Sequence, residues 1–365
     1  MASVPTELER RLIERIRRDG PITFRDFMQA SLYDPELGYY NSERLKIGAS
    51  GDYYTSSNVH PVFGAVLAKA MIDLTVEFRI DSPLTLVEIG AGTGRLAFDV
   101  LSAMHEEHPA VFDTATYIIV ETSPCMINRQ REKLEAFADH VQWRELDELE
   151  REPIVGVAFS NEFVDALPVH RIRLRSGEIN EQYVTLLSDE STLGLDWGRP
   201  STERLSDYST RMRVALRETQ IVEVNLDAID WLARMSRAVS RGFLLTIDYG
   251  DIVQHLWSPD RRQGTLRSFH KHRLIDSPLD RIGEQDITAS VNFTALIDYG
   301  RDFGFQLVSL ERQTAFLIRM GLIDRIASEH SGTETLDDLN QRLAVKNLFV
   351  PGGISDNFQV LVQRR

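Results

Sequence analysis

The chain has 365 residues, of which 42% are hydrophobic and 26% are charged, and its formal net charge is −14. These values are typical of a globular protein with one large domain or two domains. Nucleic acid backbones bind clustered lysine and arginine side chains, so the acidic balance argues against a nucleic-acid partner. It favours a cationic partner, such as an arginine-bearing peptide.

The sequence contains no run of about 18 apolar residues, the length that a membrane-spanning helix needs, and we expect no membrane partner. Residues 1–20 lack the apolar centre of a signal peptide, and Glu7, Glu9 and Glu14 argue against a transit peptide. Cys125 is the one cysteine, which fits a reducing compartment without disulfides. Together these features predict a cytoplasmic protein.

Residues 1–80 predict a helical region that precedes the main domain. Thr6 and Glu9 form a capping-box pattern before a charged helix. Residues 60–78 place apolar side chains at helical spacing. The glycine- and tyrosine-rich stretch GASGDYYTSS lies between these helices and predicts either a lid or a plain surface loop.

From residue 83 onward, predicted strands and helices alternate. The strands are expected at 84–90, 116–123, 140–146, 155–162 and 241–250, and the helices at 95–108, 124–137 and 225–239. Two final strands, at 304–314 and 357–365, bring the total to seven. This alternation predicts an α/β domain over residues 81–365 with a mostly parallel sheet covered on both faces. Insertions are expected at about 171–220, 250–292 and 315–350.

The stretch LVEIGAGTG places three glycines after the first strand of this sheet. Gly90, Gly92 and Gly94 allow a tight turn and a close approach of the backbone to a ligand. The spacing G-x-G-x-G misses the G-x-G-x-x-G fingerprint of dinucleotide-binding loops, and no P-loop lysine follows. A strand-to-helix turn without a ligand is the alternative interpretation.

Two acidic residues accompany the glycine loop. Glu88 lies within the apolar strand, where burial is costly unless an amino group or several backbone donors satisfy it. Glu121 ends the second strand, where a carboxylate can accept hydrogen bonds from ribose hydroxyls. This arrangement resembles class I S-adenosylmethionine-dependent methyltransferases. The resemblance implies that the loop packs on the methionine part, that Glu121 holds the ribose, and that Asp147 lies near the adenine.

Several longer stretches occur in an order that resembles one family: YDPELGYY, GDYYTSSNVHPVFG, LVEIGAGTG, NEFVDALPVHR, IDYG, GTLRSFHKHR and DITASVNFTAL. From about residue 22 to the C-terminus, the chain resembles the MidA-like family. That family includes a mitochondrial complex I assembly factor that methylates an arginine of a complex I subunit. The resemblance implies a class I, Rossmann-like methyltransferase fold with S-adenosylmethionine as the cofactor. It also implies that Gly51 and Asp52 lie over the cofactor site, and we expect Thr55 of the same stretch to supply a further polar contact.

The stretch FSNEFVDALPVH places an amide and two carboxylates after the fourth strand. A carboxylate can accept two N–H bonds of a guanidinium, orient one nitrogen toward a methyl donor and carry the proton that is lost. We predict this role for Glu162, with assistance from Asp165. Asn161 is expected to fix Glu162 or to contact the methionine amino group. The alternative is that both carboxylates cap a following helix.

Together with the family resemblance, these patterns predict an S-adenosylmethionine-dependent enzyme, and the resemblance implies that it methylates an arginine of a partner protein, such as a complex I subunit. An NAD-dependent oxidoreductase is an alternative, and the glycine spacing counts against it. An assembly chaperone that uses the cofactor fold to bind a partner is another. We predict no metal site, because His255, His270 and His272 lack acidic or cysteine ligands at metal spacing. A homodimer contact in the insertions is a further hypothesis.

Overall fold

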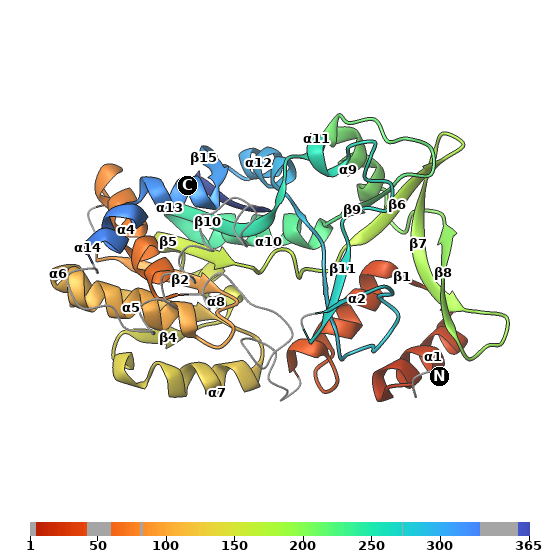
Figure 1. Ribbon diagram of the computed structural model, residues 1–365, viewed down its shortest axis with the longest axis horizontal. Coiled ribbons are helices and arrows are strands. Elements are labelled where there is room, and N and C mark those ends of the chain that lie inside the picture. The colour runs from red at the N-terminus through yellow and green to blue at the C-terminus, as the bar shows by residue number, and fades with distance from the viewer. Residues whose placement is uncertain (1–4, 42–59, 81–82, 272, 329–356) are drawn as a thin grey trace. The chain divides into compact units, whose positions relative to one another are not determined.

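The computed structural model describes residues 5–41, 60–80, 83–271, 273–328 and 357–365 (Figure 1). The predicted cofactor contacts Gly51, Asp52 and Thr55 lie outside these ranges. The described residues divide into two compact units. The accessory unit comprises Met1–Tyr53, Asp165–Trp231 and Gly250–Leu296, and the sheet unit comprises Tyr54–Val164, Leu232–Tyr249 and Ile297–Arg365.

We predicted a division of the chain at residue 80, whereas both units are discontinuous in sequence. The predicted insertions near 171–220 and 250–292 both fall in the accessory unit. The chain passes between the units within α10 (Leu226–Ala238), β10 (Val239–Asp251) and α12 (Phe293–Asp302). The predicted alternation of strands and helices therefore lies mainly in the sheet unit, and α10 and β10 extend into the accessory unit.

The sheet unit is built on a mixed, mostly parallel sheet. Its further strands are β2 (Thr85–Ile89), β3 (Thr116–Val120), β4 (Val141–Trp143), β5 (Ile154–Asn161), β15 (Gln306–Arg312) and β16 (Phe358–Arg364). The order is β15-β16-β10-β5-β2-β3-β4, and β16 runs antiparallel to both of its neighbours. The predicted α/β class is thus confirmed. The strand count differs, because in the described residues β14 (Val291–Asn292) pairs as an eighth strand with Gly250 and Asp251 of β10, which belong to the accessory unit.

Alternating side chains of these strands form the main core of the sheet unit. Because successive residues of a strand point to opposite faces, Leu86, Tyr117 and Phe159 lie on the same face and join one buried cluster. Residues of α4 (Val62–Glu77) and α5 (Arg95–Glu107) belong to that cluster and cover this face. The remaining helices of the unit are α6 (Pro109–Phe112), α7 (Pro124–Lys133), η2 (Glu135–Phe137), α8 (Leu146–Arg151), α13 (Gln313–Arg319) and α14 (Leu322–Ser328).

The accessory unit holds two antiparallel sheets. The larger contains β1 (Ile22–Thr23), β6 (His170–Arg175), β7 (Glu178–Leu186), β8 (Leu193–Gly198) and β9 (Ile221–Val224), and the smaller contains β11 (Arg267–His270), β12 (Arg273–Ile275) and β13 (Asp286–Thr288). Its helices are α1 (Glu7–Asp19), α2 (Phe24–Tyr33), η1 (Tyr39–Asn41), α9 (Arg204–Met212) and α11 (Val253–Leu256). The predicted capping box of Thr6 and Glu9 is present at the start of α1.

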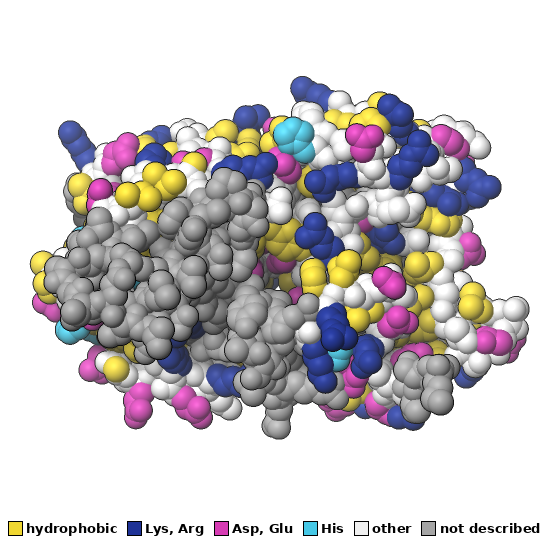
Figure 2. Space-filling model, in the orientation of Figure 1, with side chains coloured by type: hydrophobic (Ala, Val, Ile, Leu, Met, Phe, Trp, Pro, Cys, Tyr) yellow, Lys and Arg dark blue, Asp and Glu magenta, His cyan; other side chains and the backbone are white. Residues whose placement is uncertain are grey.

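The described surface carries cationic and anionic side chains together on the face that Figure 2 shows. Among the described residues, no helix combines the length and the apolar character that crossing a membrane requires. The same residues include no group of three or more histidine, cysteine, aspartate or glutamate side chains placed to bind a metal ion.

Candidate cofactor and catalytic site

The glycine loop connects β2 to α5 and takes backbone conformations that favour glycine. Gly90, with a φ of 69°, donates its N–H to the carbonyl of Val120 at 3.0 Å. A Cβ at Gly90 would lie 2.7 Å from Cδ2 of Phe163, so a side chain there would collide with that ring. Gly94, with a φ of 77°, is the N-cap of α5 and packs on Gln130. The loop therefore holds its shape through close contacts with two neighbouring segments.

Glu121 follows β3 and is fixed by three hydrogen bonds. Its Oε1 accepts the N–H groups of Thr122 at 2.8 Å and Ser123 at 2.9 Å, and its Oε2 accepts from Nε2 of Gln130 at 3.2 Å. Burial raises the pKa of the Glu121 carboxyl above its ordinary value, and these three hydrogen bonds oppose that rise. The two oxygens of a carboxylate offer about four acceptor positions, so Oε2 retains capacity for a ligand hydroxyl.

Glu88 lies inside β2 and is 2% exposed. Its Oε2 accepts a hydrogen bond of 2.6 Å from the Tyr117 hydroxyl, so a phenol rather than an amino group satisfies this oxygen. Burial raises the pKa of Glu88 to about 7, the hydrogen bond from Tyr117 opposes the rise, and the charge of Glu121 adds to it. Glu88 is thus poised between protonation states close to neutral pH.

Asp147 occupies a different environment from the one expected. We predicted it at the end of the third strand, but β4 ends at Trp143 and Asp147 lies in the first turn of α8. Its side chain is 72% exposed and forms an ion pair with Arg234 of α10. In this position the carboxylate stabilises the start of α8 and links two helices. A contact with adenine stays a prediction.

Asn161 and Glu162 form a tight turn at the carboxyl end of β5. Glu162 has a φ of 52°, and its N–H donates to the Ile247 carbonyl of β10 at 2.9 Å. Nδ2 of Asn161 donates to Oε1 of Glu162 at 3.2 Å. Among the described residues, the buried Oδ1 of Asn161 has no hydrogen-bond partner. Because only the amide nitrogen can donate to a carboxylate, this contact fixes the amide and leaves its oxygen as an acceptor.

Asp248 of β10 holds the residues that follow this turn. Its Oδ2 accepts the N–H groups of Phe163 at 3.2 Å and Val164 at 2.9 Å, and its Oδ1 accepts that of Tyr249 at 2.9 Å. No helix begins between 162 and 169, so Glu162 and Asp165 do not cap one. Asp165 is 6% exposed, and its carbonyl accepts the Ala289 N–H within the accessory unit.

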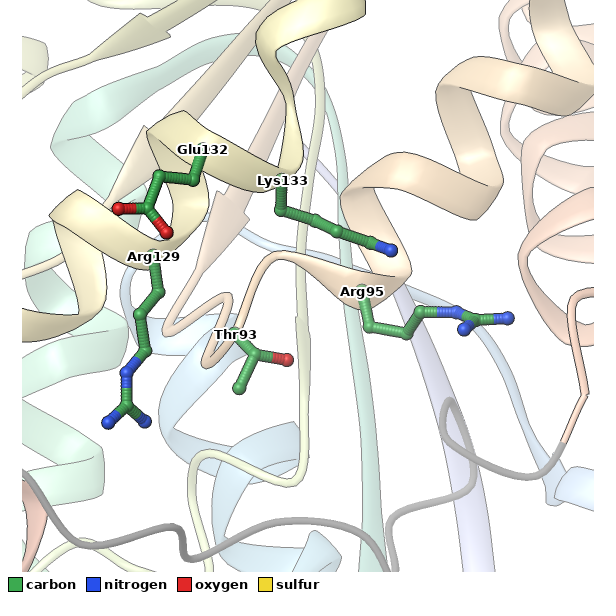
Figure 3. Close-up of a pocket in the computed structure, with 5 residues that line it drawn as sticks. All are labelled: Thr93, Arg95, Arg129, Glu132 and Lys133. Carbon is green, nitrogen blue, oxygen red and sulfur yellow. The ribbon is translucent and has the colours of Figure 1, made fainter.

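A pocket of about 480 Å³ lies beside the glycine loop (Figure 3). Thr93 of the loop, Arg95 of α5 and three residues of α7 line it, namely Arg129, Glu132 and Lys133. Figure 3 shows Lys133 reaching toward α5, where its Nζ lies 4.5 Å from the ring centroid of Phe98. This pocket contains none of the predicted site residues.

The geometry agrees with a comparison of the whole sequence. The model of a family described as putative S-adenosyl-L-methionine-dependent methyltransferases matches residues 66–310. The chain belongs to this family. It is the MidA-like family that the sequence motifs resemble, and S-adenosylmethionine is its cofactor.

Solved structures and curated proteins support this family assignment. A likely methyl transferase from Burkholderia thailandensis bound to S-adenosyl-homocysteine has a TM-score of 0.88 and 26% identity, and the match covers 100% of this chain and 95% of that one. A protein arginine methyltransferase NDUFAF7 homolog, mitochondrial, of Drosophila melanogaster is 27% identical over 78% of this chain and 68% of its own length. The NDUFAF7 protein of Danio rerio is 26% identical over 89% and 79% of the two chains.

These relatives also correct one prediction. We predicted a cytoplasmic protein, but the curated relatives are named mitochondrial proteins, which contradicts it. The charged N-terminal segment that suggested this location forms α1, in which Leu8, Leu12 and Ile16 are buried. Its composition therefore reflects packing within the fold and says nothing about the compartment.

The residues around the glycine loop fit S-adenosylmethionine. Glu121 has acceptor capacity for hydroxyl groups, and the glycine loop allows a ligand to approach its backbone closely. The buried Oδ1 of Asn161 is an acceptor suited to an amino or guanidinium group. Sequence reasoning found these groups but missed Gln130, Asp248 and Tyr117. Gln130 belongs to no recognisable sequence motif. The aspartate of the IDYG stretch was the one sequence signal that pointed to Asp248.

Proposed function

We propose that this methyltransferase transfers a methyl group to an arginine side chain of a partner protein. The observation that carries the proposal is the Asn161–Glu162 turn, with a carboxylate and a buried amide oxygen at the carboxyl end of β5. A guanidinium is cationic, planar and rich in N–H donors, so it complements these acceptors. The relatives named as protein arginine methyltransferases support the same substrate class.

S-adenosylmethionine supplies an electrophilic methyl group bound to a sulfonium sulfur. We propose that the glycine loop and Glu121 hold it, and that Glu88 supports the loop from within β2. Further proposed contacts are Asp147, Gly51, Asp52 and Thr55. These residues would bind and orient the cofactor, and positioning of this kind contributes much of the rate of an in-line transfer.

Glu162 is the proposed catalytic residue. Its carboxylate accepts two N–H bonds of the guanidinium and directs one nitrogen toward the methyl group. The guanidinium nitrogen would gain the methyl group and lose a proton to Glu162, and the neutral thioether S-adenosylhomocysteine would leave with the electron pair of the broken S–CH₃ bond. Asn161 accepts a further N–H through Oδ1, and Asp165 is proposed to assist from the next segment of the chain.

The experiment is methyl transfer from labelled S-adenosylmethionine to isolated complex I subunits, followed by hydrolysis and amino-acid analysis. We expect label in methylarginine. Glu162→Gln keeps the size of the side chain but removes its charge, and turnover should fall about 10²- to 10⁴-fold, as expected for loss of a general base. S-adenosylhomocysteine affinity should stay within about twofold, because the variant leaves the glycine loop unchanged.

Glu106→Gln, on the exposed face of α5, is the matched control and should retain full activity. Label in lysine or in a carboxyl group would contradict the proposed substrate. The chaperone alternative predicts that neither the wild type nor Glu162→Gln transfers a methyl group, and that Glu162→Gln still supports assembly of the partner protein. The oxidoreductase alternative has no support, because the cofactor is S-adenosylmethionine.

A further inference from the structure

A single buried amide connects three strand ends of the sheet unit. Gln130 of α7 is 0% exposed. Its Nε2 donates to the Gly92 carbonyl at 2.8 Å and to Oε2 of Glu121 at 3.2 Å, and its Oε1 accepts from Nε1 of Trp143 at 2.9 Å. Gly92 follows β2, Glu121 follows β3 and Trp143 ends β4. The amide thus contacts residues at or just beyond the carboxyl ends of β2, β3 and β4.

The orientation of this amide is determined by its partners. An indole N–H can only donate and a backbone carbonyl can only accept, so the Gln130 oxygen faces Trp143 and its nitrogen faces Gly92. The second hydrogen of that nitrogen is then directed at Glu121. The main chain of α7 also lies close to the loop, since a Cβ added at Gly94 would come within 3.3 Å of Cα of Gln130. Rotation of the amide would lose all three hydrogen bonds.

Two consequences follow for the ligand side of the site. The N–H and C=O groups of a trans peptide point in opposite directions. Because Gly92 directs its carbonyl at Gln130, the N–H of Thr93 points away from α7. Gln130 also occupies one acceptor position of Oε2 of Glu121, so the carboxylate cannot rotate freely. One side chain thereby sets both a backbone donor and a carboxylate acceptor.

We propose that Gln130 is a positioning residue that orients Glu121 toward the ribose hydroxyls of S-adenosylmethionine. This inference rests on the proposed role of Glu121 in the function above. Gln130 acts through Glu121 and the glycine loop and does not touch the ligand. A residue that only packs α7 against the loop would instead weaken every ligand equally, whether or not it carries ribose hydroxyls.

The test uses the full chain and calorimetric titration with S-adenosylhomocysteine and its 2′-deoxy analogue. Gln130→Met preserves the volume but removes all three hydrogen bonds. We expect about tenfold weaker binding of S-adenosylhomocysteine, the size typical for loss of a hydrogen bond to a charged group. The affinity for the 2′-deoxy analogue should fall less, so the variant binds the two ligands with more similar affinities than the wild type does. Gln142→Met, exposed on β4, is the matched control and should bind both ligands as the wild type does.

A second variant, Gln130→Glu, gives a signature that packing cannot produce. When both carboxylates are ionised, Glu121 faces a like charge and loses its donor, so binding is weak at high pH. As the pH falls, the pair takes up one proton, a donor returns and affinity rises. In Gln130→Met the slope is opposite, because loss of the hydrogen bond raises the pKa of Glu121 further and lower pH neutralises the carboxylate.

Two other charged groups among the described residues bear on this pair and are the same in both variants. They are Glu88, whose pKa responds to the charge of Glu121, and Arg131, whose guanidinium carbon lies 5.3 Å from the ring centroid of Trp143. Opposite pH slopes, together with converging affinities for the two ligands, support the proposal. Parallel slopes or equal losses for both ligands overturn it. If Gln130→Met does not fold, the pH slope of Gln130→Glu is compared with that of the wild type, and a Gln130→Glu affinity that does not rise as the pH falls overturns the proposal.

Glu121→Gln separates this inference from the proposed function. If that variant binds S-adenosylhomocysteine as tightly as the wild type, the ribose role of Glu121 is wrong and the inference is wrong with it. If Glu121→Gln weakens binding while Gln130→Met does not, only the inference about Gln130 is overturned. If both variants weaken S-adenosylhomocysteine binding and the double variant binds no more weakly than Glu121→Gln alone, Gln130 acts through the Glu121 carboxylate.

Discussion

Glu162 adopts a left-handed backbone conformation, with a φ of 52°, that is uncommon for a residue with a side chain. Such strain persists only where neighbouring contacts hold it. Here the N–H of Glu162 is bound to the Ile247 carbonyl, and Asp248 holds the next two amides. The carboxylate is therefore aimed by the backbone, which suits a group that must meet its substrate in one geometry.

Glu88 makes stability depend on pH at the level of one residue. Its pKa is raised from 4.5 to about 7 in the folded protein. The folded state therefore binds more protons than the unfolded state between these values, and stability falls as pH rises through this window. The fall approaches about 1.4 kcal/mol per pH unit for one group.

Glu88→Gln should remove this dependence, because a neutral amide does not titrate. The difference in unfolding free energy between the variant and the wild type should therefore shift in favour of the variant by about 2–3 kcal/mol from pH 5 to pH 8. Urea unfolding at both pH values, followed by circular dichroism, measures the difference. Glu106→Gln should show no such change between the two pH values. An equal offset at pH 5 and pH 8 for Glu88→Gln would exclude a raised pKa.

At the scale of secondary-structure elements, the ends of β5 and β10 form one rigid corner. β10 runs parallel to β5 with Ile247 opposite Asn161, and its next residue, Asp248, binds the amides that follow the turn. Phe163, held by Asp248, places its ring against Gly90 of the glycine loop. The proposed catalytic turn and the cofactor loop are thus held by the same short segment.

Asp248→Asn should therefore impair turnover more than cofactor binding. An amide offers one oxygen where the carboxylate offers two, so at least one of the three backbone N–H groups loses its acceptor. We expect the turnover number to fall about tenfold or more, the effect of a displaced catalytic group. Steady-state kinetics and S-adenosylhomocysteine titration measure the two effects. Asp73→Asn on the surface of α4 is the control, and matching losses in both quantities would contradict the prediction.

The elements that sequence reasoning predicted well are those with local signals. The helix expected at 95–108 is observed as Arg95–Glu107, because Gly94 caps its start and apolar residues recur at helical spacing within it. The helix considered after Glu162 is absent from the structure, because Asp248, 85 residues away from Phe163, takes the amide that would begin it. Contacts of such separation leave no periodic pattern in a sequence.

The site shows the same limit. Gly90 and Glu121 stood out because their residue types at strand ends have a chemical meaning. Gln130 did not, because its role depends on Gly92, which is 38 residues away, and on Trp143 of another strand. Asp147 was misplaced because the third strand ends earlier than its sequence predicts, and a capping box at Glu145 starts α8 instead.

At the scale of the whole molecule, a net charge of −14 and a proposed arginine-bearing substrate predict electrostatic steering. A negative protein attracts a cationic peptide over a distance that salt shortens, since the screening length falls from about 10 Å at 0.1 M to about 3 Å at 1 M. The encounter rate should therefore fall with ionic strength, whereas contacts inside the site are screened much less.

We expect kcat/KM for a cationic arginine peptide to fall several-fold between low and high salt, while S-adenosylhomocysteine affinity changes little. That ligand carries one amino and one carboxylate charge, so its net charge is near zero and steering hardly affects it. The test peptide carries lysines on both sides of its arginine, and the control is the same peptide with glutamine in place of these lysines. Its salt dependence should be shallower, because fewer charges respond to the field of the protein. A flat or rising profile for the cationic peptide would show that the acidic surface does not guide the substrate to the site.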